Sequence, residues 1–461
     1  MRSSLALSLS FALVLSPLVS ACGGDDDDDS TVDDTGDDPG DDVADDDGGS
    51  DACGDIEGRC IELSPADDGG SGGDQEALQT AFIDALPGDV ILLHAGTYEF
   101  TLGLSLDVDQ VTLRGEGEAE TVLSFLGQIE GAQGILITAD DFTAEDFAIE
   151  DTAGDGLKVE GGARIVFRGV RAEWTGEQAE DNGAYGIYPV QCTDILIEES
   201  IVRGASDAGI YVGQSERAVV RNSTVENNVA GIEIENTYDA DVYGNTATAN
   251  TGGILVFNLP DLQVESGGRT RVYDNDIFEN NGENFAPAGN TVAQVPPGTG
   301  FVALSAHQVE VFGNTFTDNM SFQVGIISYY LTPFPLEDDT YDPYSDTLYF
   351  HDNVFVGGGD MPSGTLGAVV RGALDTNLGV DAPETIPDIS FDHILNPEQV
   401  DEKTGELLPD FNICLQDNGD ADFVSLDAGA EVPFAGINLD ATPFDCAHDP
   451  LPAVELDGVP L

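Results

Sequence analysis

From residue 89 to about residue 357 the chain alternates short apolar runs with Gly, Asn and Asp and shows no helical spacing. In "AGIYVG", "AGIEIE" and "GGILVF" every second residue is apolar, which is typical of strands with one face in a core. The runs recur at intervals of 22 residues, with single intervals of 30 and 23. The apolar anchors of these runs are Ile91, Leu113, Ile135, Leu157, Ile187, Ile210, Ile232 and Ile254.

A repeat of this length predicts a stacked solenoid, because one unit cannot bury its own apolar face. Propeller blades need about 40 residues or more, so the period excludes a propeller. We therefore predict an all-β fold, a right-handed parallel β-helix. Residues 74–86 predict an amphipathic helix, capped by Asp74 and ended by Pro87, that closes the open edge of the solenoid.

Several stretches resemble known β-helix proteins. "LQTAFIDALPGDVILLHAGTYEF" resembles the entry cap of pectate-lyase-like proteins. "NGAYGIYPVQC", "NFAPAGNTVAQVPPGTG" and "NICLQDNGDADFVSLD" resemble a family of exported parallel β-helix proteins, mostly bacterial lipoproteins, of unassigned function. The resemblance covers nearly all of residues 75–455. We expect a pectin-lyase-like β-helix domain over residues 56–374 and an irregular extension, residues 375–461, that folds back along it.

The N-terminus predicts export. An apolar run follows Arg2, and residues 19–22, "VSAC", resemble a lipoprotein signal-peptidase site, which implies a signal peptide over residues 1–21 and lipid on Cys22. A plain cleaved signal is the alternative. The run is too short to span a membrane, so the lipid would be the only membrane contact. Gly23 and Gly24, by resemblance to bacterial sorting rules, favour the outer membrane or the cell surface, within the bacterial cell envelope.

The segment after Cys22 is strongly acidic. Residues 25–55 hold 16 Asp and almost no large apolar side chain, so residues 22–55 predict a disordered, self-repelling tether. A solvated spacer is favoured over calcium binding by this run. The whole chain has a net charge of -74, from 88 acidic and 14 basic residues. This excess argues against nucleic acid or an anionic membrane as a partner.

Cysteine usage predicts two disulfides. With Cys22 lipidated, the exported chain is expected to pair Cys53 with Cys60 and Cys414 with Cys446, which leaves Cys192 as a buried thiol. Neither pair has zinc-site spacing, and no metal site or cofactor is certain. "EDDTYDPYSD", residues 337–346, offers carboxylates to calcium but lacks EF-hand spacing, so an acidic loop is favoured.

Counting from the anchors places polar residues in ladders across the coils. One charged set predicts ion pairs between coils, in preference to a cradle for an acidic polymer: Arg164, Asp194, Arg217 and Asp239, with Arg168, Glu198 and Arg221. A second set predicts a stack of amides that satisfies turn backbone: Gln191, Gln214, Asn236 and Asn258. The outward ladder next to the anchors is Lys158, Tyr188, Tyr211, Glu233 and Leu255.

The outward ladder predicts the floor of a groove. "AEWTGEQAEDNGA", before Tyr185, and "GENFAPAGNTVAQVPPGTG", before Phe301, enter at the same corner of their coils and would wall it. Trp174 in the first wall would stack on a sugar ring or pack within the protein. Lys158 stands out because no carboxylate is its direct ladder neighbour. Tyr211 is expected to bind substrate, and Asp207 and Glu233 to orient sugar hydroxyls.

The turn "YGIYPV" partly resembles the Tyr-Gly-x-Asp-Pro-His pattern of mannuronan epimerases, which, like related alginate lyases, remove the proton beside a sugar carboxylate. Tyr185, Gly186 and Pro189 match, whereas Tyr188 replaces the Asp and Val190 the His.

One hypothesis is a lyase or epimerase of extracellular polysaccharide, with Lys158 neutralising charge or removing a proton and Tyr185 and Tyr188 as acid or base. Tyr188 would then need a cation that lowers its pKa. The alternative is a non-catalytic solenoid that binds glycan or another exported protein.

Overall fold

The computed structural model describes Cys53, residues 58–66 and residues 71–461. These residues belong to one compact unit, Ser50–Leu461. The predicted signal peptide, Cys22 and most of the predicted tether lie outside the described residues. Within the described ranges, no helix has both the length and the apolar character needed to cross a membrane.

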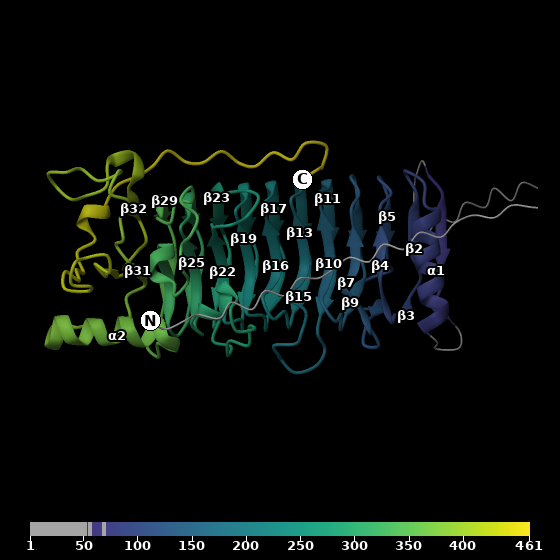
Figure 1. Ribbon diagram of the computed structural model, residues 1–461, viewed down its shortest axis with the longest axis horizontal. Coiled ribbons are helices and arrows are strands. Elements are labelled where there is room, and N and C mark those ends of the chain that lie inside the picture. The colour runs from purple at the N-terminus through teal and green to yellow at the C-terminus, as the bar shows by residue number, and fades with distance from the viewer. Residues whose placement is uncertain (1–52, 54–57, 67–70) are drawn as a thin grey trace, which may run out of the picture. The chain divides into compact units, whose positions relative to one another are not determined.

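The described chain winds through three parallel sheets and, in the regular coils, adds one strand to each sheet per turn (Figure 1). Sheet A contains, in spatial order, β1 (Cys60–Leu63), β2 (Val90–Leu93), β5 (Thr112–Arg114), β8 (Thr143–Glu145), β11 (Ala163–Arg168), β14 (Thr193–Glu198), β17 (Glu216–Arg221), β20 (Tyr238–Tyr243), β23 (Gly268–Tyr273), β26 (His307–Phe312), β29 (Asp346–His351) and β32 (Ile413–Gln416).

Sheets B and C follow in every regular coil. Sheet B contains β3 (Gly96–Glu99), β6 (Thr121–Ser124), β9 (Ala148–Glu150), β12 (Arg171–Glu173), β15 (Ile201–Arg203), β18 (Thr224–Glu226), β21 (Thr246–Thr248), β24 (Asp276–Phe278), β27 (Thr315–Thr317) and β30 (Val354–Val356). Sheet C contains β4 (Leu102–Leu106), β7 (Glu130–Ile137), β10 (Asp155–Glu160), β13 (Tyr185–Val190), β16 (Ala208–Gly213), β19 (Ala230–Glu235), β22 (Gly252–Phe257), β25 (Thr299–Leu304), β28 (Phe322–Ile327), β31 (Ile389–Phe391) and β33 (Phe423–Ser425).

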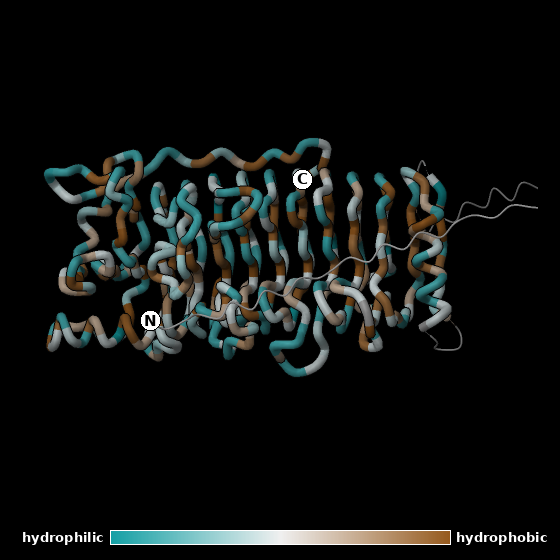
Figure 2. Tube along the Cα trace, in the orientation of Figure 1, coloured by the Kyte–Doolittle hydropathy of each residue, from teal (hydrophilic) through white to brown (hydrophobic). Residues whose placement is uncertain are grey.

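The fold prediction is confirmed: the described chain is a parallel β-helix with few helices. These are α1 (Ser71–Asp84), α2 (Gly364–Leu378) and 3-10 turns at Thr291–Gln294, Tyr329–Leu331, Gly379–Asp381, Pro409–Phe411 and Thr442–Phe444. Apolar and polar residues alternate along many strands (Figure 2). The apolar positions stack from coil to coil in one continuous buried core.

Helix α1 covers the first coils of the core, where Leu78 and Phe82 are buried. It begins three residues before the predicted start, so Asp74 lies inside its first turn. The Asp74 carboxylate accepts the backbone N–H of Ala66 and that of Glu99, at 2.8 and 2.9 Å. Asp74 therefore ties the helix to two neighbouring segments, and the prediction that it caps the helix was wrong.

The predicted ladder of apolar anchors is correct only from Ile135 onward. Ile91 pairs with Leu113 in sheet A, whereas Ile135 pairs with Leu104 in sheet C. The interval of 22 residues between Leu113 and Ile135 thus links two different sheets. Beyond this point the anchors Leu157, Ile187, Ile210, Ile232 and Ile254 are direct register partners.

The amides that stack through the core are not the predicted ones. Asn275 donates from Nδ2 to Asn314 Oδ1 and to the Val242 carbonyl, both at 2.9 Å. The same pattern joins two ladders of asparagines: Asn245, Asn275, Asn314, Asn353 and Asn418, and Asn228, Asn250, Asn280 and Asn319. Among the amides that the sequence predicted, Asn236 and Asn258 bond carbonyls of nearby loops and turns.

Ion pairs between coils cover sheet A, as the alternating charges predict. Arg217 Nε lies 2.7 Å from Asp194 Oδ1. Glu198 bonds both Arg168, at 2.6 Å, and Arg221. Arg164 departs from the predicted ladder because it pairs with Asp141 of the preceding coil. Burial of Glu198 raises its pKa, but the two guanidinium groups outweigh this and leave the pKa below the usual value.

The sheets continue past the predicted domain boundary at residue 374, with β31, β32 and β33. The last residues then run back over sheet A (Figure 1). Val454 and Val459 pack on Val166, Leu196 and Val219 of three successive coils. The backbone N–H of Val454 donates to Asp241 and that of Asp457 to Asp194.

The predicted disulfides, Cys53–Cys60 and Cys414–Cys446, are both present. Cys192 is a buried thiol, as predicted, and burial raises its pKa to about 11.

Candidate functional site on sheet C

The outer face of sheet C carries the predicted ladder. Lys158 is the register partner of Tyr188, and Tyr211 is that of Glu233, which is followed by Leu255. Insertions rise on both sides of this face, as the element order shows. Residues 174–184, 279–298 and 357–388 connect sheet B to sheet C, and residues 258–267 and 328–345 connect sheet C to sheet A.

A glycine at the second position of β10, β13, β16, β19, β22 and β25 kinks the start of these sheet C strands and adds another row to the outer face. A Cβ at Gly186 would lie 2.3 Å from Val202 Cγ1 in the core and 2.8 Å from the carbonyl oxygen of Gly209. Position 186 thus faces the core, and the residue before it, Tyr185, faces outward. Gly156 places Asp155 in the same row. Strict alternation from the inward Leu157 would have put Asp155 inside, which is why sequence reasoning missed it.

Three tyrosines meet on this face. The ring centroid of Tyr185 lies 4.5 Å from that of Tyr188 and 4.6 Å from that of Tyr211. The centroids of Tyr188 and Tyr211 are 5.0 Å apart, and these two rings meet edge to face. The Tyr211 ring lies over Gly213, where any side chain would displace it. Its hydroxyl donates to Glu235 Oε1 at 2.6 Å.

Lys158 borders the tyrosine cluster. Its Nζ lies 5.0 Å from the centroid of the Tyr188 ring and 3.1 Å from Glu160 Oε2. The sequence predicted no carboxylate directly next to Lys158 in the ladder. In the structure its partner is Glu160, two residues later on the same strand. Glu160 is half exposed, so water screens this ion pair.

The cation does not lower the pKa of Tyr188. Burial, together with the carboxylates of Asp155 and Glu235, raises that pKa well above the usual value. Burial raises the pKa of Tyr185 in the same direction. Both hydroxyls therefore stay protonated at neutral pH and can donate protons, but neither is a base. From the sequence we required a cation that lowers the pKa of Tyr188 if Tyr188 is to act as a base, and the structure does not meet this requirement.

Two carboxyl groups flank Tyr185. Burial raises the pKa of Asp155 to about 6, against the opposing effects of Lys158 and of the Tyr185 backbone N–H. Burial and the nearby carboxylates of Glu235 and Asp155 raise the pKa of Asp207 to about 7, against hydrogen bonds from Asn290 and Tyr185. Asn290 Nδ2 reaches Asp207 Oδ2 at 2.9 Å from the insertion 279–298. At neutral pH both groups are poised to exchange protons.

Four predicted substrate-binding residues are buried. Trp174 has 7% of its surface exposed, Asp207 6%, Tyr211 4% and Glu233 2%. The Trp174 indole N–H donates to the Thr152 carbonyl at 2.8 Å, so its ring packs within the protein. Burial raises the pKa values of Glu233 and Glu235, and Glu233 Oε2 is a buried oxygen without a hydrogen-bond partner among the described residues. These four residues are therefore covered by other parts of the protein and do not face a ligand.

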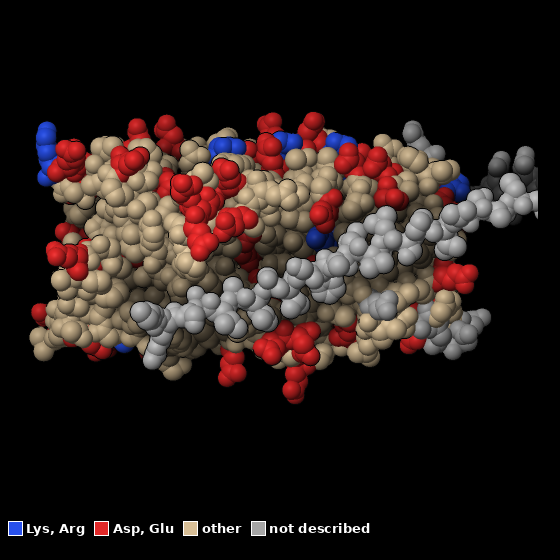
Figure 3. Space-filling model, viewed as in Figure 1, with Lys and Arg blue, Asp and Glu red and all other residues tan. Residues whose placement is uncertain are grey.

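The accessible part of the site thus includes Asp155, Lys158, Glu160 and Tyr188, each of which keeps part of its surface exposed. In the view of Figure 1, acidic side chains are spread over the molecule and basic ones are few (Figure 3). The arrangement combines a carboxyl group that titrates near neutrality, a protonated phenol and one ammonium group.

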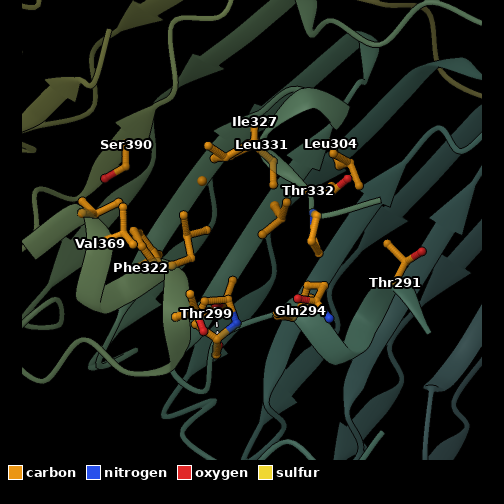
Figure 4. A pocket seen from close by; sticks show the side chains of 18 of the residues that line it. Thr291, Gln294, Thr299, Leu304, Phe322, Ile327, Leu331, Thr332, Val369 and Ser390 are labelled. Carbon is orange, nitrogen blue, oxygen red and sulfur yellow. Dashed lines mark hydrogen bonds between the residues drawn. The ribbon is translucent and has the colours of Figure 1, made fainter. Parts of the chain in front are cut away.

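A separate cavity of about 470 Å³ lies further along sheet C, between residues 291–299, residues 331–333 and α2 (Figure 4). Leu304, Phe322, Ile327 and other apolar side chains line it. Its Thr299 and Ser390 hydroxyls already donate to the carbonyls of Pro296 and Pro387. With few polar groups free to orient a sugar, this cavity is not the candidate site.

The chain matches the family model for a right-handed β-helix region over residues 133–283 and 178–340. Among solved structures it is similar to the A-module of mannuronan C-5 epimerase AlgE4 from Azotobacter vinelandii, with 17% identity and a TM-score of 0.48 over 77% of this chain and 91% of that one.

Two further similar structures are both lyases. Alginate lyase from a Paenibacillus species shares 15% identity, with a TM-score of 0.35 over 66% of this chain and 98% of that one. Pectate lyase Pel9A shares 14%, with a TM-score of 0.38 over 67% and 80%. No curated protein matches.

Proposed function

We propose that this right-handed parallel β-helix protein acts on an extracellular polysaccharide at the sheet C site, by moving the proton beside a sugar carboxylate as a lyase or epimerase does. The observation that carries the proposal is the raised pKa of Asp155, about 6, beside Lys158 and Tyr188. A base works best when its pKa lies near the working pH.

The accessible residues take separate roles. Lys158 neutralises the sugar carboxylate, and to do so its ammonium group leaves Glu160. Breaking this ion pair costs little free energy, because Glu160 is half exposed and water screens the pair. Asp155 removes the proton from the ring carbon that bears the carboxylate. Tyr185, which bonds Asp207, positions the neighbouring ring of Tyr188.

Removal of the proton by Asp155 can lead to two reactions, and bonds and protons balance in both. In a lyase, the electron pair left by the removed proton forms a ring double bond, the glycosidic C–O bond breaks, and Tyr188 gives its proton to the leaving oxygen. In an epimerase, Tyr188 returns a proton to the same carbon from the opposite face and no bond to oxygen breaks. Both outcomes need a protonated phenol, and the raised pKa of Tyr188 keeps its hydroxyl protonated at neutral pH.

Kinetics of three variants test these roles. With a polyuronate substrate, Asp155→Asn is expected to lower kcat about 100-fold or more, and Tyr188→Phe by a similar factor, with little change in KM. Lys158→Ala is expected to lower kcat and, in addition, to raise KM. Tyr243→Phe, on sheet A, is the matched control and should leave both constants unchanged. Unaltered kcat in Asp155→Asn would contradict the assignment of the base.

The second candidate function is glycan binding without catalysis. It is favoured by the contact of three tyrosine rings, because rigid amphipathic rings are common in binding surfaces. Under this function the parent protein binds a polysaccharide and releases no product, and Tyr188→Ala abolishes the binding. Product formation by the parent would decide for the enzyme.

We further propose that lipid on Cys22 holds the protein in the bacterial cell envelope, on the strength of the sequence "VSAC". Cys22→Ser in the full chain is expected to abolish labelling by a fatty acid and to move the protein from the membrane fraction to the soluble one. A variant that stays labelled and membrane-bound would contradict this proposal.

A further inference from the structure

A histidine and two aspartates from distant segments meet beside sheet A. His307 begins β26, and its register partner Asp346 begins β29. Asp342 belongs to the insertion 328–345. His307 Nδ1 lies 3.1 Å from Asp346 Oδ2, and one ligand atom from each of the three residues lies within 4.8 Å of the others. From the sequence alone we interpreted residues 337–346 as an acidic loop. The histidine could not be linked to this loop, because His307 lies about 35 residues before Asp342.

A fourth polar group borders this cluster. Gln399 Nε2 donates to Asp346 Oδ2 at 3.0 Å, whereas Gln399 Oε1 is buried and has no hydrogen-bond partner among the described residues. A buried amide oxygen without a donor costs about 1–3 kcal/mol. Rotation of the amide would bring this oxygen to the position of Nε2, next to the aspartate oxygen, and a cation bound there would satisfy both.

Two other histidines show what an ordinary ion pair looks like in this chain. At His94, Nδ1 faces Glu116 and Nε2 faces Glu62. At His351, Nδ1 faces Asp352 and Nε2 faces Glu310. In both cases the carboxylates stand at opposite ring nitrogens and cannot share one ion. Among the described residues, the three groups converge on one point only at His307.

We propose that His307, Asp342 and Asp346, completed by the amide oxygen of Gln399, bind a divalent transition-metal cation, for which Zn²⁺ is the best match. Zinc accepts imidazole nitrogen together with carboxylate oxygen and prefers four ligands. Calcium takes six to eight oxygen ligands, so an imidazole ligand disfavours it.

The site would join three parts of the fold. His307 and Asp346 belong to sheet A, Asp342 to the insertion 328–345, and Gln399 to the segment after β31. The same insertion contacts the end of β22 in sheet C, because the Tyr341 hydroxyl donates to the carbonyl of Asn258, the residue after β22. A bound cation therefore fixes an insertion that walls the sheet C face. This role is structural and does not depend on the proposed catalytic function.

Titration calorimetry of the full chain with ZnCl2 tests the proposal. The parent is expected to bind one Zn²⁺ per chain at a site that His307→Gln and Asp342→Asn weaken at least about tenfold. His351→Gln is the matched control, since it removes a histidine that also contacts two carboxylates, and it should leave this affinity unchanged. The acidic residues 25–55 are common to all four proteins, so any zinc that they bind cancels in the comparison.

Limited proteolysis gives a second readout. Zn²⁺ is expected to protect residues 328–345 from cleavage in the parent and in His351→Gln, and not in His307→Gln or Asp342→Asn. Asp342 lies in an insertion, so its replacement leaves the β-helix ladders intact even if His307→Gln folds poorly. Equal zinc affinity and equal protection in the parent and in Asp342→Asn would overturn the proposal.

Discussion

At the scale of single residues, the sheet C site depends on carboxyl groups whose pKa values burial has moved toward neutrality. Asp155 and Asp207 flank Tyr185, with pKa values of about 6 and about 7. Asp155 stays partly exposed, whereas Asp207 is buried and held by Asn290. Their different access to solvent separates their roles under the proposed function, in which Asp155 meets substrate and Asp207 orients Tyr185.

The buried Asp207 predicts how stability depends on pH. Its pKa is raised in the folded state, so its contribution to stability is complete below about pH 4 and is lost as the pH rises through about 7. Between these values it lowers the free energy of unfolding by up to about 1.4 kcal/mol per pH unit. Asp207→Asn removes the titration, so urea unfolding at pH 5, 6, 7 and 8 should show a flatter decline than the parent. Asp420→Asn, at an exposed position, should leave the slope unchanged, and a parent-like slope in Asp207→Asn would contradict the role of Asp207 in this pH dependence.

At the same scale, the sequence could predict Lys158, Tyr188 and their alignment because the outward ladder follows from counting. It could not predict Asp155, since the glycine kink at Gly156 breaks the period of two on which the counting rests. It also could not predict that Tyr211 is buried, because its cover comes from the insertion 279–298, which lies up to about 90 residues away.

At the scale of elements, the asparagine ladders hold successive turns together. Asn275 bonds the Val242 carbonyl and Asn314, and its Oδ1 accepts from Asn245. Asn275→Ala would leave these buried groups without partners, which is expected to lower the free energy of unfolding by about 2–4 kcal/mol. Thr248→Ala, on the outer face of sheet B, should change it by about 0.5 kcal/mol at most. Chemical unfolding followed by circular dichroism measures both, and equal effects would refute the role of the ladder.

The C-terminal segment is an element without regular structure that covers sheet A. Val454→Asp would place a charge among apolar side chains, next to Asp241, whose carboxylate the Val454 N–H already contacts. We expect the segment to detach locally, with faster hydrogen exchange at residues 449–459 and unchanged exchange in β19. Glu455→Gln, at an exposed neighbouring position, is the control. Unchanged exchange in Val454→Asp would show that these contacts do not hold the segment.

The elements illustrate what periodicity can and cannot reveal. The apolar spacing was sufficient for the fold class, but the interval of 22 residues also linked Leu113 to Ile135 across two sheets. The asparagines carried a clearer signal that apolar counting passed over, because Asn245, Asn275 and Asn314 each precede a second buried asparagine by five residues.

At the scale of the whole molecule, the net charge of -74 opposes both folding and the approach of an acidic polymer. Salt screens repulsion between exposed charges, with a Debye length of about 10 Å at 0.1 M and about 3 Å at 1 M. The Tm is therefore expected to rise when KCl is increased from 0.02 to about 0.5 M. Scanning calorimetry measures this, and a Tm that falls with salt would mean that the ion pairs of sheet A outweigh the general repulsion.

The proposed function requires that the sheet C face moves a proton on a sugar acid through Asp155. The most direct test is to incubate the full chain with alginate or pectate in D2O and to follow deuterium at the ring carbon beside the carboxylate by NMR, together with the absorbance of unsaturated product. We expect deuterium incorporation or unsaturated product with the parent protein and neither with Asp155→Asn. Bound polysaccharide with no exchange and no product in the parent, or equal exchange in Asp155→Asn, would contradict it.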